Sequence, residues 1–83
     1  MWILYLIECQ RGTRTVYYTG ITTDIQRRFN EHLAGKGARF TRAHKPIRVL
    51  ASHTYANRSE ASRAEAAVKK LPRSNKLAFF DKH

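Results

Sequence analysis

Two segments near the start of the chain carry the hydrophobic pattern of β-strands. The segment from Trp2 to Cys9 reads WILYLIEC and the segment from Thr13 to Thr19 reads TRTVYYT, so both are rich in β-branched and aromatic residues. The link Gln10-Arg11-Gly12 between them is short and polar, and its glycine can adopt a positive φ. The pattern therefore predicts an antiparallel hairpin whose second strand ends at Gly20.

Apolar residues at helical spacing predict a helix after this hairpin. The stretch Thr23-Asp24-Ile25-Gln26 has the spacing of a capping box with the threonine as N-cap, so the helix is expected to begin there. Gly35 and Gly37 are expected to end it. The stripe that this helix is expected to bury recurs every four residues and consists of Ile25, Phe29 and Leu33.

The middle of the chain has a weaker pattern than its two ends. The segment Gly37–Pro46 is basic and irregular, and it is interpreted as a loop because proline disfavours helix at the residue before it. The run from Ile47 to Tyr55 alternates only weakly between apolar and polar residues, and it predicts a third strand.

The last third of the chain predicts helices. A helix is expected from about Ser59 to Leu71, with Asn57 and Ser59 available as caps and Pro72 closing it, and a short final helix is expected after Arg73. The order β-β-α-β-α-(α) predicts an α/β (α+β) fold in which a small, three-stranded, mainly antiparallel sheet is flanked by helices. A chain of 83 residues has room for one core, so one domain over residues 1–83 is expected.

The net charge of the chain predicts a polyanionic binding partner. Sixteen Lys and Arg residues against six Asp and Glu residues give a formal net charge of +10. Nucleic acid is the leading partner, because each phosphate that a basic side chain neutralises releases condensed counterions. The arginines are dispersed along the chain and are not gathered on one amphipathic helix, so an anionic membrane surface is the weaker alternative.

Other features narrow the cellular setting that we expect. Cys9 is the single cysteine and no CxxC motif is present, which favours a reducing, cytoplasmic compartment and no structural zinc. No apolar stretch approaches the roughly 20 residues of a membrane span. We expect a monomer that interacts with DNA, without a membrane and without a small-molecule cofactor.

Five residues could form a site for phosphate chemistry. Tyr5 and Tyr18 lie on paired strands, and their hydroxyls can converge if both rings point to the same sheet face. Arg28 and His32 are four residues apart on one helix face and could bracket a phosphate, which the planar arginine fork binds through two oxygens. Glu65 is the acid best placed for function, because it lies in a helix otherwise dominated by Ala, Arg and Lys, and one carboxylate with waters and substrate oxygens suffices for Mg²⁺.

The order and spacing of these residues resemble the GIY-YIG nucleases, and in particular their short stand-alone bacterial members, the UPF0213-like proteins. The stretches that carry the resemblance are YYTGITTDIQRRFNEHLAGKGARFTR and RSEASRAEAAVKKL, and the match spans most of the chain. The two tripeptides of the motif here read Ile3-Leu4-Tyr5 and Tyr18-Thr19-Gly20. They depart from the family pattern at their first and middle positions but retain both tyrosines and the glycine.

The resemblance implies a DNA endonuclease that depends on a divalent ion, Mg²⁺ or Mn²⁺. It implies that Glu65 holds the ion, that Arg28 neutralises charge on the phosphate, and that Tyr18 acts as general base with Tyr5 or His32 assisting. A tyrosine has an ordinary pKa of about 10, so this base needs nearby positive charge or a relay to His32. His32 alone would be the simpler base, and the sequence leaves both assignments open.

Further residues are expected to contact the nucleic acid. The composition of the segment Lys36–Lys45 favours a substrate clamp over a solvated connection, and Phe40 among arginines predicts stacking on an unpaired base, hence single-stranded or branched DNA. In some family members, an asparagine that follows the glutamate helps to position the substrate. Asn75 is the corresponding candidate here, with a spacing that matches only approximately. The predicted contacts are Arg27, Lys36, Arg39, Phe40, Arg42, Lys45 and Asn75.

Each of these residues also has an ordinary structural explanation. Strand tyrosines usually pack a core or a surface, Arg28 could lie on a solvated helix face, and Glu65 could pair with Lys69 one turn later. The combination in this order favours the endonuclease. The alternatives are a nucleic-acid-binding module without catalysis and an accessory domain that docks on a DNA repair or recombination protein.

Overall fold

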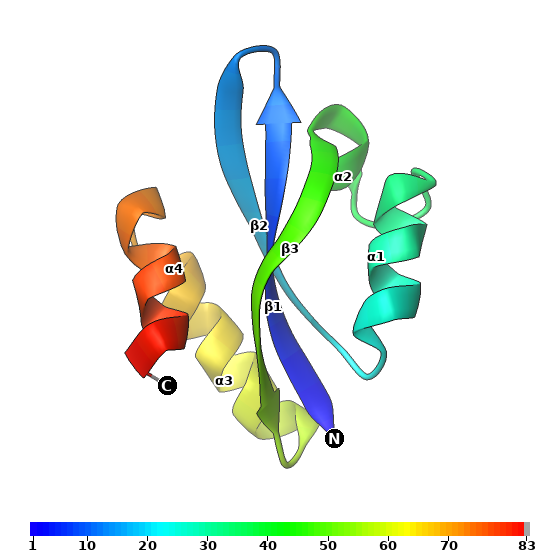
Figure 1. Cartoon of the computed structure of the whole chain (residues 1–83). Coiled ribbons are helices and arrows are strands. Elements are labelled where there is room, and N and C mark those ends of the chain that lie inside the picture. The colour runs from blue at the N-terminus through cyan, green and yellow to red at the C-terminus, as the bar shows by residue number, and fades with distance from the viewer. Residues whose placement is uncertain (83) are drawn as a thin grey trace.

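A three-stranded antiparallel sheet with the strand order β2-β1-β3 forms the middle of the fold, and helices cover both of its faces (Figure 1). The computed structural model describes residues 1–82. It confirms the predicted α+β class and order of elements, with one additional short helix, α2. The elements are β1 (Trp2–Arg11), β2 (Arg14–Thr22), α1 (Ile25–Leu33), α2 (Arg39–Ala43), β3 (Lys45–Tyr55), α3 (Arg58–Lys69) and α4 (Arg73–Lys82).

The β1–β2 hairpin is longer than predicted. Its turn contains Gly12 at a φ of 62°, a conformation that glycine adopts without steric cost. Strand β2 continues to Thr22, so the prediction that Gly20 ends the strand is wrong. Gly20 instead pairs with Tyr5 inside the hairpin, and this register brings the glycine backbone under the tyrosine ring.

Strand β1 is the central strand, and it is buried on both sides. Tyr5, Ile7 and Cys9 face α1 and α2, where partly buried apolar residues of both helices pack against them. Leu4 and Leu6 alternate with them and therefore face the other side, where α3 packs against the sheet. The strand is consequently a nearly continuous hydrophobic run.

Strand β3 pairs irregularly with β1, which explains its weak alternation in the sequence. The pairing register shifts twice, between Leu6 and Ile7 and between Glu8 and Cys9. Each β-bulge adds a residue to one strand and so breaks the alternation of side chains. The strand also begins at Lys45, two residues before the predicted start.

Helix α1 begins with a different cap from the one predicted. Its N-cap is Asp24, whose side chain accepts a hydrogen bond from the Arg27 amide at 3.0 Å, and not Thr23. The Thr22 hydroxyl accepts a hydrogen bond from the Asp24 amide at 3.2 Å and holds the cap in place. A carboxylate at this position also interacts favourably with the helix dipole.

The buried face of α1 is rotated relative to the predicted stripe. Ile25 and Phe29 pack against the core as expected, but Leu33 is 51% exposed. The buried residue of the last turn is His32, which is 1% exposed. An imidazole therefore occupies the position that the pattern assigned to a leucine.

A tight turn at the end of α1 returns the chain toward the sheet. Gly35 has a φ of 75°, and the amides of Gly35 and Lys36 bond the carbonyls of His32 and Glu31, as in a Schellman motif. The segment Gly37–Pro46, predicted as a loop, contains α2 and the first residues of β3. That prediction is wrong because contacts of α2 with α1 and β3, which local composition does not show, stabilise this short helix.

The two C-terminal helices lie together on the opposite side of the sheet from α1 and α2 (Figure 1). Asn57 caps α3 as predicted and accepts a hydrogen bond from the Glu60 amide at 2.9 Å. The Lys76 ammonium of α4 donates to the Val68 carbonyl at 2.8 Å, which joins the two helices. Within residues 1–82, no helix has the length and apolar character that crossing a membrane requires.

Candidate active site

Three aromatic side chains from three elements meet on the α1 face of the sheet. They are Tyr5 of β1, Tyr18 of β2 and His32 of α1. The ring centroids of Tyr5 and Tyr18 are 6.3 Å apart, those of Tyr5 and His32 are 6.1 Å apart, and those of Tyr18 and His32 are 5.1 Å apart. Both tyrosine rings therefore lie on one face of the hairpin, beside the helix that carries Arg28.

A chain of hydrogen bonds runs through the imidazole of His32. Its Nε2 lies 3.1 Å from the Tyr5 hydroxyl, and its Nδ1 lies 2.8 Å from the Thr41 hydroxyl. The Thr41 hydroxyl donates to the Ala38 carbonyl at 2.8 Å. Tyr5, His32 and Thr41 are each at most 2% exposed, so this chain is almost fully buried, and the partly exposed Arg28 lies at its Tyr5 end.

Two glycines make room for this arrangement. A Cβ on Gly20 would lie 2.4 Å from the Tyr5 hydroxyl oxygen, and a Cβ on Gly37 would lie 2.2 Å from Nδ1 of His32. Any other residue would displace these rings. Gly37 was predicted to end the helix, but the turn uses Gly35, and Gly37 instead allows close contact with the His32 ring.

Arg28 lies next to the Tyr5 hydroxyl and keeps part of its side chain exposed. Its Nη1 is 3.1 Å from Oε1 of Glu31, and the side chains of Arg28 and Glu31 are 32% and 39% exposed. Burial raises the pKa of Tyr5 to about 12, while Arg28 opposes this rise and the nearby Tyr18 and Glu65 add to it. Tyr5 is therefore a protonated phenol at neutral pH.

His32 is the neutral partner of this phenol. Burial lowers its pKa below the ordinary value of 6.5, the charge of Arg28 lowers it further, and Glu31 partly offsets both effects. At neutral pH the imidazole thus has one unprotonated nitrogen that can accept a proton. The pair of Tyr5 and His32 holds one transferable proton in a buried hydrogen bond.

Glu65 lies on α3, which packs against β1 and β2, the strands that carry Tyr5 and Tyr18. The charge of Glu65 is the smallest of the influences that raise the pKa of Tyr5. The predicted pairing along the helix is also present, because Oε2 of Glu65 lies 3.4 Å from the Lys69 ammonium. The Glu65 side chain is 23% exposed, so solvent or a bound ion can reach it.

The donor set near Tyr5 is compatible with a hard divalent ion that completes its shell with substrate. Residues 1–82 contain no cluster of three or more His, Cys, Asp or Glu side chains arranged to hold a metal. A structural zinc site needs four such ligands, whereas Mg²⁺ binds through one or two carboxylates with waters and phosphate oxygens. Glu65, as a single carboxylate, fits a Mg²⁺ site and not a structural zinc site.

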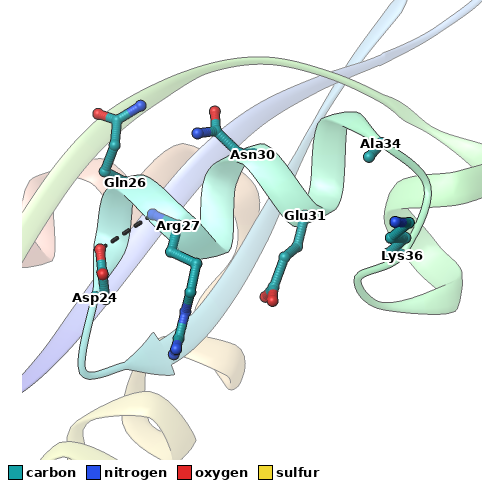
Figure 2. A pocket seen from close by; sticks show the side chains of 7 residues that line it. All are labelled: Asp24, Gln26, Arg27, Asn30, Glu31, Ala34 and Lys36. Carbon is teal, nitrogen blue, oxygen red and sulfur yellow. Dashed lines mark hydrogen bonds between the residues drawn. The ribbon is translucent and has the colours of Figure 1, made fainter.

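Most of the predicted nucleic-acid contacts lie at the surface on the α1 and α2 side. A hollow of about 500 Å³ lies along α1. In Figure 2, Arg27 and Glu31 of its lining point to one side of the helix, and Lys36 lies beyond the helix end. Glu31 bonds Arg28, so this hollow adjoins the Tyr5 group. The exposed basic residues on this side are Arg27, Lys36, Arg39, Arg42 and Lys45.

Two of the predicted contacts are placed differently. Phe40 is partly buried and stacks on His44 at 4.1 Å and on Tyr18 at 5.6 Å between ring centroids, so packing inside the protein accounts for its ring. Asn75 is exposed in the first turn of α4, and its side-chain oxygen accepts a hydrogen bond from Ser74.

Two residues of the site have no signal in the sequence. Thr41 lies nine residues beyond His32 in a different helix, and Gly37 lies in the segment predicted as a loop. Their contacts depend on the turn after α1, which folds this segment back toward the imidazole. No local periodicity connects them.

Residues 1–78 match the sequence family described as the GIY-YIG catalytic domain. The chain belongs to the GIY-YIG family. A UPF0213 protein of Xanthomonas axonopodis is 56% identical over 95% of this chain and 74% of its own length. A UPF0213 protein of Cupriavidus pinatubonensis is 51% identical over 98% of this chain and 87% of its own length. The predicted resemblance is confirmed, and a GIY-YIG domain implies a nuclease-type function.

A solved structure shares the fold with this GIY-YIG chain. The solution NMR structure of a UPF0213 protein from Bacillus halodurans superimposes with a TM-score of 0.55 and is 40% identical, covering 95% of this chain and 82% of that one. This similarity supports the arrangement of sheet and helices described above.

Proposed function

We propose that this chain is a metal-dependent endonuclease that hydrolyses phosphodiester bonds in DNA. The buried hydrogen bond between Tyr5 and His32, with Arg28 beside it, is the observation that supports this most strongly. A tyrosine that only packs a core does not need a neutral imidazole on its hydroxyl and a cation next to it. A group that removes a proton from water beside a phosphate needs both.

Arg28 binds the scissile phosphate in this proposal. Its side chain is partly exposed, and its partner Glu31 is also partly exposed, so the guanidinium can contact a ligand without a large desolvation cost. The planar fork of arginine matches two oxygens of a phosphate. Charge that builds on these oxygens as the bond breaks is thereby stabilised.

Tyr5 and His32 together take the proton of the attacking water. The water gives its proton to the Tyr5 oxygen while the Tyr5 proton moves to Nε2 of His32, and the new oxygen–phosphorus bond forms as the bond to the 3′ oxygen breaks. His32 forms a hydrogen bond with Tyr5, and within residues 1–82 it forms none with Tyr18. We therefore assign the proton relay to Tyr5. This differs from the role for Tyr18 that the resemblance implies.

Glu65 is the residue that would hold the divalent ion, Mg²⁺ or Mn²⁺. Such an ion, when bound, supplies Lewis-acid stabilisation of the phosphate and of the departing 3′ oxygen. The carboxylate is suited to this because it is partly exposed, and its helix packs against both strands that carry the tyrosines. Its pairing with Lys69 is a surface interaction worth only about 0.2–0.5 kcal/mol and can be exchanged for an ion.

DNA phosphates on either side of the site would contact the exposed basic residues of the α1 and α2 face. These are Arg27, Lys36, Arg39, Arg42 and Lys45. The packing of Phe40 against Tyr18 and His44 supports no role in base stacking. The proposed contacts are to phosphates, which single-stranded, branched and duplex DNA share.

The Glu65→Gln variant tests the proposal. Wild-type protein should cleave labelled DNA with Mg²⁺ or Mn²⁺ and not with EDTA. The variant should lose cleavage by at least about 100-fold while binding DNA as tightly or more tightly, because one negative charge near the phosphate is removed. Glu60→Gln is the matched control, since Glu60 is an exposed acid in the first turn of the same helix.

The outcomes separate the alternatives. Salt-dependent DNA binding by a wild-type protein that cleaves no single-stranded, branched or duplex substrate would establish a binding module and reject the endonuclease. Absence of salt-dependent DNA binding would instead favour an accessory domain that docks on another protein. A larger loss of cleavage for Tyr18→Phe than for Tyr5→Phe would return the base to Tyr18.

A further inference from the structure

Thr41 is a buried polar residue that neither the family motif nor the proposed chemistry includes. It lies in α2 and is 2% exposed, and its hydroxyl contacts both the imidazole of His32 and the carbonyl of Ala38 at 2.8 Å. A hydroxyl has one proton to donate and can also accept. The direction of its two hydrogen bonds determines which nitrogen of His32 carries the proton.

The contacts allow one consistent assignment of protons. The Ala38 carbonyl can only accept, so the Thr41 hydroxyl donates to it. The Thr41 oxygen must then accept from Nδ1–H of His32, which leaves Nε2 as an acceptor for the Tyr5 hydroxyl. Arg28 can only donate to the Tyr5 oxygen, and this agrees with a Tyr5 proton that points to His32.

The opposite tautomer leaves a buried group without a partner. If Nε2 carried the proton, the Tyr5 oxygen would face two donors, Arg28 and His32, and the Tyr5 proton would need another acceptor. Tyr5 is 1% exposed, and the hydrogen bonds of residues 1–82 offer no such acceptor. An unsatisfied buried donor costs about 1–3 kcal/mol, which is enough to select the Nδ1–H form.

We propose that Thr41 is a positioning residue that holds His32 as the Nδ1–H tautomer, so that Nε2 is ready to accept the Tyr5 proton. The tautomer follows from the geometry alone, whereas its consequence for cleavage rests on the endonuclease function proposed above. Thr41 touches neither substrate nor ion in this proposal. It acts through the imidazole, much as a carboxylate or carbonyl orients a histidine ligand in many metal sites.

Gly37 supports the same assignment from the other side of the ring. A Cβ at this position would lie 2.2 Å from Nδ1 and 2.8 Å from Cε1 of His32, so the glycine leaves space for the imidazole edge that bonds Thr41. Its φ is not in the positive region, so backbone conformation does not require a glycine here. The close approach of the His32 imidazole is therefore the reason that this position requires a glycine.

The tautomer of His32 can be measured directly. In protein labelled with ¹⁵N-histidine, two-bond ¹H–¹⁵N correlation spectra distinguish a protonated from an unprotonated ring nitrogen, and the His32→Gln variant assigns the signals. We expect Nδ1 of His32 to be protonated and Nε2 to be unprotonated at pH 7.5. A wild-type spectrum with Nε2 protonated would overturn the proposal without any other variant.

Two substitutions of similar size separate the hydroxyl from the shape of Thr41. Thr41→Val removes the acceptor and should shift His32 toward the Nε2–H form, with cleavage lowered about 10–100-fold, as for partners that orient metal-bound histidines. Thr41→Ser keeps the hydroxyl and should retain tautomer and cleavage. Thr54→Val, at an exposed threonine of β3, is the matched control.

The combined readouts distinguish failure of this inference from failure of the proposed function. DNA binding in EDTA should be unchanged in all these variants. Wild-type tautomer and cleavage in folded Thr41→Val protein would reject the role of Thr41. If Thr41→Val is unfolded by circular dichroism, Gly37→Ala, which displaces the ring from Thr41, provides the same test. A tautomer shift in a protein that cleaves no DNA would uphold the role of Thr41 and reject the endonuclease.

Discussion

The two faces of strand β1 are equally buried but hold different kinds of side chain. Leu4 and Leu6 face α3 with no exposed area, and Tyr5, which lies between them in the sequence, faces α1 and is 1% exposed. The leucines are buried by apolar packing alone. The tyrosine hydroxyl is buried in a hydrogen-bond chain with His32 and Thr41.

This difference separates apolar packing from polar hydrogen bonding on the two sides of one strand. Full burial of a leucine contributes about 1.5–3 kcal/mol, and other apolar residues of similar volume can replace it at modest cost. A buried hydroxyl contributes to stability only when its hydrogen-bond partners are present. Among residues 1–82, every buried side-chain nitrogen and oxygen has such a partner. The α1 face is therefore more specific in its residues, and the α3 face is more tolerant.

Removal of one group from each face of β1 should give opposite results. Tyr5→Phe should lower single-turnover cleavage by about 10²–10⁴-fold, because it removes the proton relay. Leu6→Ala should lower the free energy of unfolding by about 2–5 kcal/mol and leave the cleavage rate of folded protein unchanged. Cleavage assays at low temperature and urea unfolding measure the two effects. Full activity of Tyr5→Phe would show that Tyr5 only packs.

Glycines of the same hairpin provide a second contrast. Gly20→Ala should lower cleavage by about 100-fold, because the new Cβ overlaps the Tyr5 hydroxyl and a shift of about 1 Å in a catalytic group costs that much. Gly12→Ala has open space around its Cβ, but its φ of 62° should cost about 1–2 kcal/mol of stability. Folded Gly12→Ala protein should cleave DNA at the wild-type rate. Equal activity of both variants would contradict the close-contact role of Gly20.

Basic residues on the two sides of the sheet should differ in DNA binding. Substitution of Arg39 and Arg42 on α2 with alanine should reduce the slope of log K against log salt by about 1 for each lost phosphate contact. Arg63→Ala on α3 should leave the slope unchanged, because this exposed residue lies two positions before Glu65 and therefore does not share its side of the helix. Fluorescence anisotropy over a range of salt concentrations measures the slopes. An equal decrease for Arg63→Ala would show that charge acts without regard to face.

Acid should weaken the α1 face before it affects apolar packing. The pKa of His32 is below 6.5 in the folded protein, so below that pH the unfolded chain binds a proton more readily. The contribution of His32 to stability is fully present above pH 6.5 and is lost as pH falls through its lowered pKa. Urea unfolding between pH 5 and 7.5 measures how the free energy of unfolding depends on pH. The His32→Gln variant should show a weaker dependence. An unchanged dependence in the His32→Gln variant would contradict this role of His32.

Element types were predictable because their signals are local. The hairpin strands, the helix after Gly20, the Asn57 cap and the final helix follow from residue types and spacing within short windows. The errors lie where distant contacts decide. Helix α2 depends on packing against α1 and β3, and the two bulges of β3 disturb the alternation that identifies a strand.

The candidate site could be predicted in part for the same reason. Tyr5, Tyr18, Arg28 and His32 have recognisable order and spacing, so the sequence predicts that they meet. The partner of each polar atom is not a local property. Which tyrosine bonds His32, and that Thr41 bonds its other nitrogen, emerges only when α2 folds back on α1.

The sequence by itself determines the class of fold, the net positive charge and the membership of the GIY-YIG family, because periodicity, charge and motif spacing are read along the chain. Tertiary structure alone decides that His32 and not Leu33 is buried, that Gly20 and Gly37 leave room for rings, and where the proton on the imidazole lies. Those outcomes depend on atoms from distant segments competing for the same small volume, where burial penalises every polar group that lacks a partner.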